Sequence, residues 1–179
     1  KFLDSLFSYQ RDFVLDDSRF KLLLKSRQIG FSYTTAGASL LSAMERELDQ
    51  IVLSASQDQA DLVRNYCRLW AEKLEIELVP DGKSLVAPGG KRIYFLPSNF
   101  RTVQGYSGDL WMDEFAWHMH PEKIYKAVLP TITIGDRRLV LMSTPYTQQD
   151  KFGEIWSGRG DDYDIYSAHK YTIHDAIAA

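Results

Sequence analysis

KSRQIGFS, at Lys25–Ser32, is the most informative stretch of the sequence. It follows the apolar run Phe20–Leu24 and precedes a segment of small residues. This order predicts a strand, a glycine-containing loop and a helix that begins at Ser32. It is typical of a phosphate-binding loop, in which backbone N–H groups and a helix N-terminus face the phosphates.

The loop departs from the usual G-x-x-x-x-G-K-[ST] pattern at its lysine. Gly30 and Ser32 are in register with the second glycine and the hydroxyl residue, but Phe31 occupies the lysine position. A lysine stands instead at Lys25, where the first glycine would be. Because short glycine motifs arise by chance, the prediction depends on whether the rest of a nucleotide-hydrolysing site follows.

The second half of such a site follows at residues 109–114, DLWMDE. Apolar residues running into Asp113 and Glu114 predict a buried parallel strand that ends at a site, since open α/β sheets bind ligands at the carboxyl ends of their strands. Asp113 would hold Mg²⁺, directly or through water, and Glu114 would orient and deprotonate the attacking water. The alternative is a pair of ordinary surface carboxylates. The spacing from the loop fits intervening βα units and favours catalysis.

Length and composition limit the class of protein. The 179 residues, 45% hydrophobic and 25% charged, indicate one soluble globular domain. No apolar run approaches the ~20 residues of a membrane helix, and no signal peptide opens the sequence. The single cysteine, Cys67, is predicted to be a small buried hydrophobe, with a reactive thiol as the alternative. A net charge of −3 argues against a chain-wide electrostatic grip on nucleic acid, though not against a local one.

Strand and helix patterns alternate along the chain. We expect helices at residues 8–15, 32–46, 57–75, 121–128 and 151–156. We expect strands at residues 19–24, 51–53, 110–112, 138–142 and 164–171, and a hairpin at 83–97 whose strands are 84–86 and 92–96. Strands that alternate with helices predict an α/β fold with a mainly parallel sheet and right-handed crossovers.

Six motifs then occur in a characteristic order. They are Tyr9-Gln10, the loop at 25–32, Leu53-Ser54-Ala55-Ser56, Gln104-Gly105, Asp113-Glu114 and Ser143-Thr144-Pro145. In this order the chain resembles, over nearly its whole length, the ATPase domain of the large terminase subunit of tailed bacteriophages or prophages. Some members of that family also move the lysine to the first position of the loop and place an aromatic residue before the serine.

The resemblance implies a three-layer P-loop NTPase of the ASCE (RecA-like) class, with helices on both sides of a mainly parallel sheet. Residues 1–179 would form a single ATPase domain, an N-terminal fragment of a longer protein whose separate nuclease domain lies C-terminal to it. Its activity would be Mg²⁺-dependent ATP hydrolysis that drives double-stranded DNA into a capsid. ATP and Mg²⁺ are therefore the expected ligands.

The family's functional positions can be transferred residue by residue. The catalytic set would be Lys25, Arg27, Asp113 and Glu114, and Ser32 with Asp113 would hold Mg²⁺. The nucleotide would contact Tyr9, Gln10, Lys25, Ser26, Arg27, Gln28, Ile29, Gly30, Phe31, Ser32, Ser143 and Thr144. Gln10 would recognise the adenine edge with Tyr9 stacked on the ring; alternatively, Tyr9 and Phe13 form one apolar helix face. Arg27 could stabilise γ-phosphate charge, couple the loop to the strand of Asp113, or form a salt bridge that shapes the loop.

Partners follow from the resemblance as well. They are double-stranded DNA, a portal protein and a small terminase subunit, with assembly into a homo-oligomeric ring in the host cytoplasm and no membrane association. An arginine finger supplied in trans stays open among Arg101, Arg137, Arg138 and Arg159. Arg101 could also replace an arginine that many terminases place before the glycine equivalent to Gly105, or it could equally be a solvated loop residue.

Three further points are left open by the residues. His118 and His120 beside the two carboxylates could indicate a metal site, although a loop or helix-cap role is preferred. The tryptophans and the aromatic residues of 163–171 are expected in the core. Two other functions compete: a DEAD-like helicase or remodelling ATPase, which would need a second RecA-like domain, and a nucleotide-binding module that has lost hydrolysis, suggested by Phe31.

Overall fold

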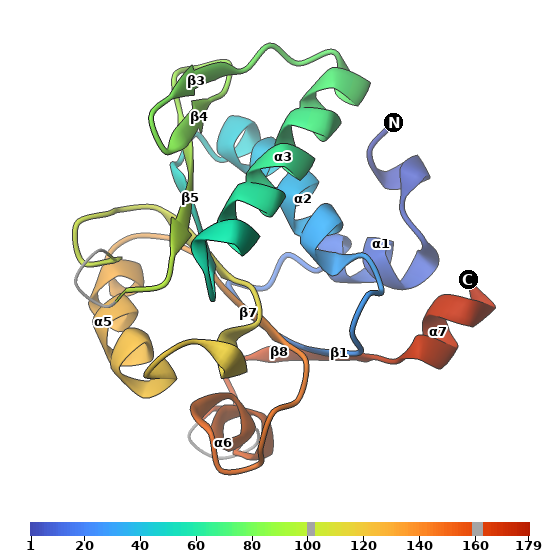
Figure 1. Cartoon of the computed structure of the whole chain (residues 1–179), viewed down its shortest axis with the longest axis vertical. Coiled ribbons are helices and arrows are strands. Elements are labelled where there is room, and N and C mark those ends of the chain that lie inside the picture. Colours follow the sequence, from blue (N-terminus) through green and yellow to red (C-terminus); the bar gives the residue numbers. More distant parts are fainter. Residues whose placement is uncertain (100–102, 159–162) are drawn as a thin grey trace.

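A single sheet organises the computed structural model, which describes residues 1–99, 103–158 and 163–179 (Figure 1). Its eight strands lie in the order β3-β4-β5-β2-β6-β7-β1-β8. They are β1 (Phe20–Lys25), β2 (Gln50–Ser54), β3 (Val79–Asp81), β4 (Ser84–Val86), β5 (Arg92–Pro97), β6 (Asp109–Met112), β7 (Leu139–Ser143) and β8 (Ser167–Tyr171). The β3–β4 and β4–β5 pairs are antiparallel, and every other neighbouring pair is parallel.

Helices cover both faces of the sheet. The helical elements of the described residues are η1 (Leu3–Ser5), α1 (Ser8–Leu15), α2 (Phe31–Glu45), α3 (Gln57–Leu74), η2 (Phe115–Trp117), α5 (Pro121–Thr133), α6 (Lys151–Ser157) and α7 (Ile173–Ala178). One core gathers side chains of α1, α2 and α3, and the other gathers side chains of α5 and α6. The expected α/β fold with three layers is confirmed.

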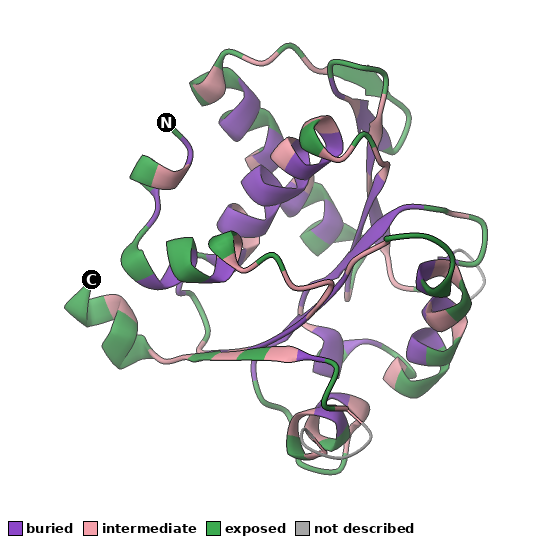
Figure 2. Ribbon diagram, turned by 180° about the vertical axis from the view of Figure 1, so that it is seen from behind, coloured by how far each residue is buried: buried purple, intermediate pink, exposed green. Residues whose placement is uncertain are grey.

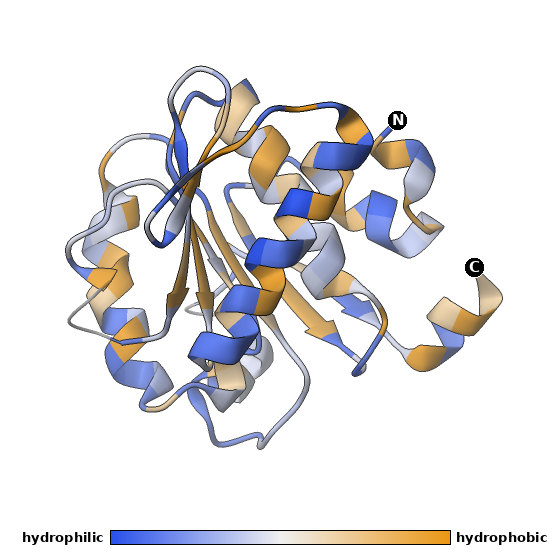
Figure 3. Ribbon diagram, turned by 45° about the horizontal axis from the view of Figure 1, so that its top comes forward, coloured by the Kyte–Doolittle hydropathy of each residue, from blue (hydrophilic) through white to orange (hydrophobic). Residues whose placement is uncertain are grey.

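The central strands are apolar on both faces because both faces are covered. In β1, Leu22 belongs to the core of α5 and α6, while the next residue, Leu23, belongs to the core of α1, α2 and α3. Ile51 and Val52 divide in the same way in β2. Figures 2 and 3 show the result, a buried and hydrophobic sheet centre beneath helices whose outer faces are polar.

Most predicted elements are confirmed within a few residues, and the differences have local causes. α5 continues past Pro130 to Thr133, with the proline in its last turn. β8 begins at Ser167 rather than at 164, since residues 163–165 form a turn. The short elements β3, η1, η2 and α7 are not predicted by the sequence patterns. Cys67 is fully buried, as predicted, and burial raises its pKa to about 12.

The parallel register places three strand ends side by side. Leu24 pairs with Ser143, and Met112 pairs with both Leu53 and Leu141. The carboxyl ends of β1, β6 and β7 therefore meet at one edge of the sheet, which is where ligands bind in open α/β folds. No helix in the described part of the chain is both long and apolar enough to cross a membrane.

Candidate functional site

The loop at Lys25–Ser32 connects β1 to α2 through two left-handed residues. Gln28 has φ +58° and Gly30 has φ +81°, and α2 begins directly afterwards at Phe31. The helix N-terminus, with its free backbone N–H groups, thus faces the strand ends. Phe31 is buried, with its ring centroid 5.4 Å from that of Phe13 and 5.8 Å from that of Tyr171. The aromatic residue at the usual lysine position is therefore part of the core.

Helix α1 supports this loop. The Tyr9 hydroxyl and Gln10 Nε2 both donate to the Ile29 carbonyl, at 2.9 and 3.2 Å, and Gln10 Oε1 accepts from the Phe7 backbone N–H at 3.1 Å. Tyr9 and Phe13 both pack on Phe31, as the apolar-face alternative describes. Contacts of Tyr9 and Gln10 with adenine stay a prediction.

Gly30 is a position where the structure requires glycine. Its φ is +81°, and an added Cβ would lie 2.6 Å from Gln10 Nε2. We expect Gly30→Ala to lower the free energy of unfolding by about 2 kcal/mol, from left-handed strain and from loss of the Gln10–Ile29 hydrogen bond. Gly90→Ala is the matched control, because Gly90 has the same φ of +81° and open space around it.

Urea unfolding of the two variants separates strain from contact. Gly90→Ala should lose only the strain, about 1 kcal/mol. An equal loss in both variants would show that Gln10 does not support the loop.

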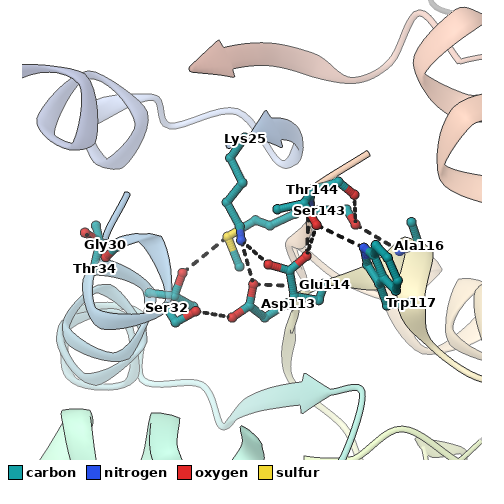
Figure 4. A network of polar contacts seen from close by, with 12 residues as sticks. Lys25, Gly30, Ser32, Thr34, Asp113, Glu114, Ala116, Trp117, Ser143 and Thr144 are labelled. Carbon is teal, nitrogen blue, oxygen red and sulfur yellow. Dashed lines mark hydrogen bonds and ion pairs between the residues drawn. The ribbon is translucent and has the colours of Figure 1, made fainter. Parts of the chain in front are cut away.

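Four side chains converge where the loop meets the end of β6 (Figure 4). Lys25 Nζ donates to Glu114 Oε1 and lies 3.6 Å from Asp113 Oδ1. Ser32 Oγ donates to Asp113 Oδ2 at 2.5 Å. Lys25 and Asp113 are each 5% exposed, so this is a largely desolvated cluster of one cation and two carboxylates. The displaced lysine of the loop thus contacts Asp113 and Glu114, the two carboxylates of the predicted catalytic set.

The end of β7 completes the cluster. The Thr144 backbone N–H and hydroxyl both donate to Glu114 Oε2, at 2.9 and 2.8 Å. Ser143 Oγ accepts from the Ala116 N–H at 3.1 Å and donates to the Thr144 carbonyl at 2.7 Å. Burial alone would raise the pKa of Glu114, but the Lys25 ammonium and the Thr144 hydrogen bonds outweigh burial and hold this pKa below its usual value. Glu114 is therefore ionised at neutral pH.

Other predicted residues lie outside this cluster. Ser26 Oγ accepts from the Ile173 N–H at 3.1 Å, and Gln28 is exposed. Arg27 is exposed too, and its guanidinium carbon lies 5.0 Å from the centre of the Trp117 ring. Arg27 thus contacts the segment that follows the two carboxylates; whether it also meets γ-phosphate stays a prediction.

The histidine and arginine candidates take separate positions. His118 is buried and donates from Nε2 to the Asp113 carbonyl at 2.7 Å, and burial lowers its pKa. Arg137 and Arg138 lie just before β7, at the opposite end of the sheet from the cluster, and donate to the Thr131 carbonyl and to Asp17. Arg101 and Arg159 lie outside the described residues.

Two aromatic residues of the site were not among those predicted. Trp117 is 40% exposed and Tyr146 is 59% exposed, so the expectation that the tryptophans are all core residues is wrong for Trp117. Trp117 Nε1 donates to Thr144 Oγ1 at 2.9 Å, and its ring centroid lies 4.5 Å from that of Tyr146. Their positions just after Asp113-Glu114 and Ser143-Thr144 are the signal in the sequence that could have identified them.

The fold and this cluster together define a three-layer α/β domain of the P-loop NTPase class. Residues 22–178 match the family model described as terminase large subunit, T4likevirus-type, N-terminal. The chain belongs to this terminase family, as the sequence resemblance predicted.

Two relatives of the chain are named as ATPase subunits of phage terminases. The chain is 33% identical to a probable terminase ATPase subunit of Haemophilus phage HP1 and 31% identical to the terminase ATPase subunit of Escherichia phage P2, over 159 residues in each case. Each alignment covers 88% of this chain but only 26% and 27% of the two relatives. The chain thus spans about a quarter of the length of these proteins.

Solved structures confirm the fold. The large terminase ATPase domain of Thermus phage P74-26 superposes with a TM-score of 0.78 at 16% identity, covering 99% of this chain and 85% of that chain. The large terminase of bacteriophage HK97 gives a TM-score of 0.67 at 18% identity, covering 92% of this chain and 39% of that chain.

Proposed function

We propose that this chain is the ATP-hydrolysing motor domain of a phage terminase large subunit, and that Mg²⁺-dependent hydrolysis at the described cluster drives double-stranded DNA into a capsid. The observation that carries the proposal is the position of Lys25 Nζ, which leaves the end of β1 and lies between Asp113 and Glu114. A cation on the phosphate loop, beside one carboxylate for a metal and one for a water, is what phosphoryl transfer needs. Family membership and the names of the relatives support the same activity.

The donor set fits Mg²⁺. Ser32 Oγ and Asp113 Oδ2 already lie 2.5 Å apart and offer only oxygen, and Mg²⁺ is usually bound by one or two protein oxygens together with substrate phosphates and water. Ser32 and Asp113 would hold the ion. When bound, Mg²⁺ neutralises the charge that develops on the β- and γ-phosphates.

The chain's own residues would perform the remaining steps. Phosphates would face the N–H groups at the start of α2, with Gly30 permitting their close approach. Lys25 would exchange its two carboxylate partners for phosphate oxygens, which releases Glu114. The Glu114 carboxylate would then accept a proton from the water that attacks the γ-phosphate.

Assembly and partners belong to the same proposal. We expect a homo-oligomeric ring in the host cytoplasm that contacts a portal protein and a small terminase subunit. An arginine supplied by a neighbour would add to catalysis, since such fingers contribute roughly 10³–10⁵ in rate.

The experiment that tests the proposal measures ATP turnover of the purified protein with Mg²⁺, with EDTA, and with or without blunt duplex DNA. Turnover should require Mg²⁺ and should rise with duplex DNA under conditions that allow assembly. A protein that binds ATP but shows no turnover in any of these conditions would contradict the hydrolase and favour a nucleotide-binding module.

Binding to DNA should be weak and nonspecific for the monomer. The chain carries 21 Lys and Arg against 24 Asp and Glu, so tight binding to the duplex should require several subunits together. Affinity measured at several salt concentrations should fall with a slope of roughly −0.9 per phosphate engaged. Tight or sequence-specific binding by the monomer would point instead to a dedicated DNA-recognition protein.

A further inference from the structure

Trp117 is an exposed aromatic residue held between two segments of the site. It ends η2, three residues after Glu114, and is 40% exposed. The Arg27 guanidinium carbon lies 5.0 Å from the centre of its ring, and the Tyr146 ring centroid lies 4.5 Å away at an interplanar angle of 53°. Cation–π and aromatic contacts of this kind fix a ring that burial does not hold. The ring therefore joins the phosphate loop to the segment that follows β7.

The indole N–H directs a chain of hydrogen bonds toward Glu114 (Figure 4). Trp117 Nε1 donates to Thr144 Oγ1 at 2.9 Å, and Thr144 Oγ1 donates to Glu114 Oε2 at 2.8 Å. An indole N–H can only donate, whereas a hydroxyl both donates and accepts. The indole N–H therefore occupies an acceptor position of Thr144 Oγ1. The single proton of the Thr144 hydroxyl is then directed to the Glu114 carboxylate.

These hydrogen bonds determine which oxygen of Glu114 is available to accept a proton. Oε2 accepts two hydrogen bonds, from the backbone N–H and the hydroxyl of Thr144. Oε1 has Lys25 as its partner, and that partner is the one that phosphates would remove. Oε1 is thus the oxygen that becomes free to accept a proton from water.

We propose that Trp117 is a positioning residue for hydrolysis: it fixes the Thr144 hydroxyl, which holds Glu114 Oε2 and presents Oε1 to the attacking water. This inference rests on the proposed ATPase activity. It adds to that activity a residue outside the loop and carboxylate motifs, whose ring contact with Arg27 makes the orientation of Glu114 depend on the conformation of the phosphate loop.

The kinetic test uses Trp117→Phe, which keeps an aromatic ring for Arg27 and Tyr146 but removes the N–H donor. The turnover number should fall about tenfold, the scale of one hydrogen bond, while ATP affinity stays unchanged. In a Thr144→Val background, the same substitution should have no further effect, because the hydroxyl on which it acts is absent.

Trp111→Phe is the matched control. Trp111 Nε1 also donates to a side-chain oxygen, Gln50 Oε1 at 2.8 Å, but this bond is buried in the sheet and leads away from Glu114. Its loss should lower thermal stability without changing the turnover number. A tenfold fall in turnover for both variants would reduce the Trp117 effect to general destabilisation and overturn the proposal.

An NMR measurement tests the hydrogen bonds of Trp117 independently of ATP turnover. With ¹⁵N-labelled tryptophan, the indole N–H signal of Trp117 should shift in Glu114→Gln and in Thr144→Val, while the signal of Trp111 stays in place. An unmoved Trp117 signal, or full turnover in Trp117→Phe, overturns the positioning role. A parent protein without turnover contradicts the proposed function instead, and the indole signals still decide whether the chain of hydrogen bonds exists.

Discussion

Glu114→Gln is expected to lower ATP turnover by roughly 10²–10⁴, the usual contribution of a general base, while ATP binding is retained. Glutamine has nearly the shape of glutamate and can still accept from Thr144, but it cannot take a proton from water. ATP affinity should even rise slightly, because the ion pair of Lys25 with Glu114 competes with phosphate in the parent. Nucleotide binding by calorimetry and steady-state turnover, measured on the same preparation, separate the two effects.

Asp113→Asn is the matched control for this prediction. It is an equally conservative change at the adjacent carboxylate, but it should weaken Mg²⁺-dependent binding of ATP rather than spare it. Equal losses of binding in the two variants would overturn the division of roles between Asp113 and Glu114.

The stability of Glu114→Gln also tests the electrostatics of the cluster. The pKa of Glu114 lies below its ordinary value of 4.5, so its carboxylate contributes stability that is fully present above the unfolded pKa. That contribution is lost as the pH falls through the lower, folded pKa. The parent should therefore be more stable than the variant at pH 7, and the difference should shrink below pH 4.5.

The sequence predicts the outline of this site because the relevant information is local. An apolar run ending in a glycine loop, and another ending in two carboxylates, identify strand ends without knowledge of the partners. Parallel sheets then bring strand ends to a common edge. This is why Lys25, Ser32, Asp113 and Glu114 could be grouped, and why the structure places them within hydrogen-bonding or ion-pair distance.

The position of Trp117 just after Asp113-Glu114 places it near the site, but its hydrogen bond to Thr144 could not be predicted from the sequence in the same way. Glu114 has φ +52°, a left-handed conformation that is uncommon for residues other than glycine and that no local pattern signals. This turn redirects the chain so that η2 brings Trp117 back to Thr144. The bounds of β8 and α5 differ from the prediction for local reasons, because a turn at residues 163–165 precedes β8 and because α5 includes Pro130 near its end.

Lys25→Ala is expected to have the second largest effect. If Lys25 supplies the phosphate cation, its loss removes charge-assisted hydrogen bonds of about 1.5–3 kcal/mol each, and ATP affinity should fall about 10- to 100-fold. It also leaves Asp113 and Glu114 adjacent in a desolvated site without their cation, which should lower the free energy of unfolding by about 3 kcal/mol. Adding Glu114→Gln should restore part of this stability, because one of the two repelling charges is then removed.

Phe31→Leu is the control for Lys25→Ala, because Phe31 stands at the position where most phosphate loops carry the phosphate-binding lysine. Phe31 is nevertheless buried, with its ring against Phe13 and Tyr171. Its substitution should lower stability and leave the ATP affinity of the folded protein close to that of the parent. If Lys25→Ala instead binds ATP like the parent once its stability is accounted for, then Lys25 is only the counter-ion of the carboxylates. Arg27, the other cation of the loop, would then take the phosphate role, and its contact with Trp117 would have to break for nucleotide to bind.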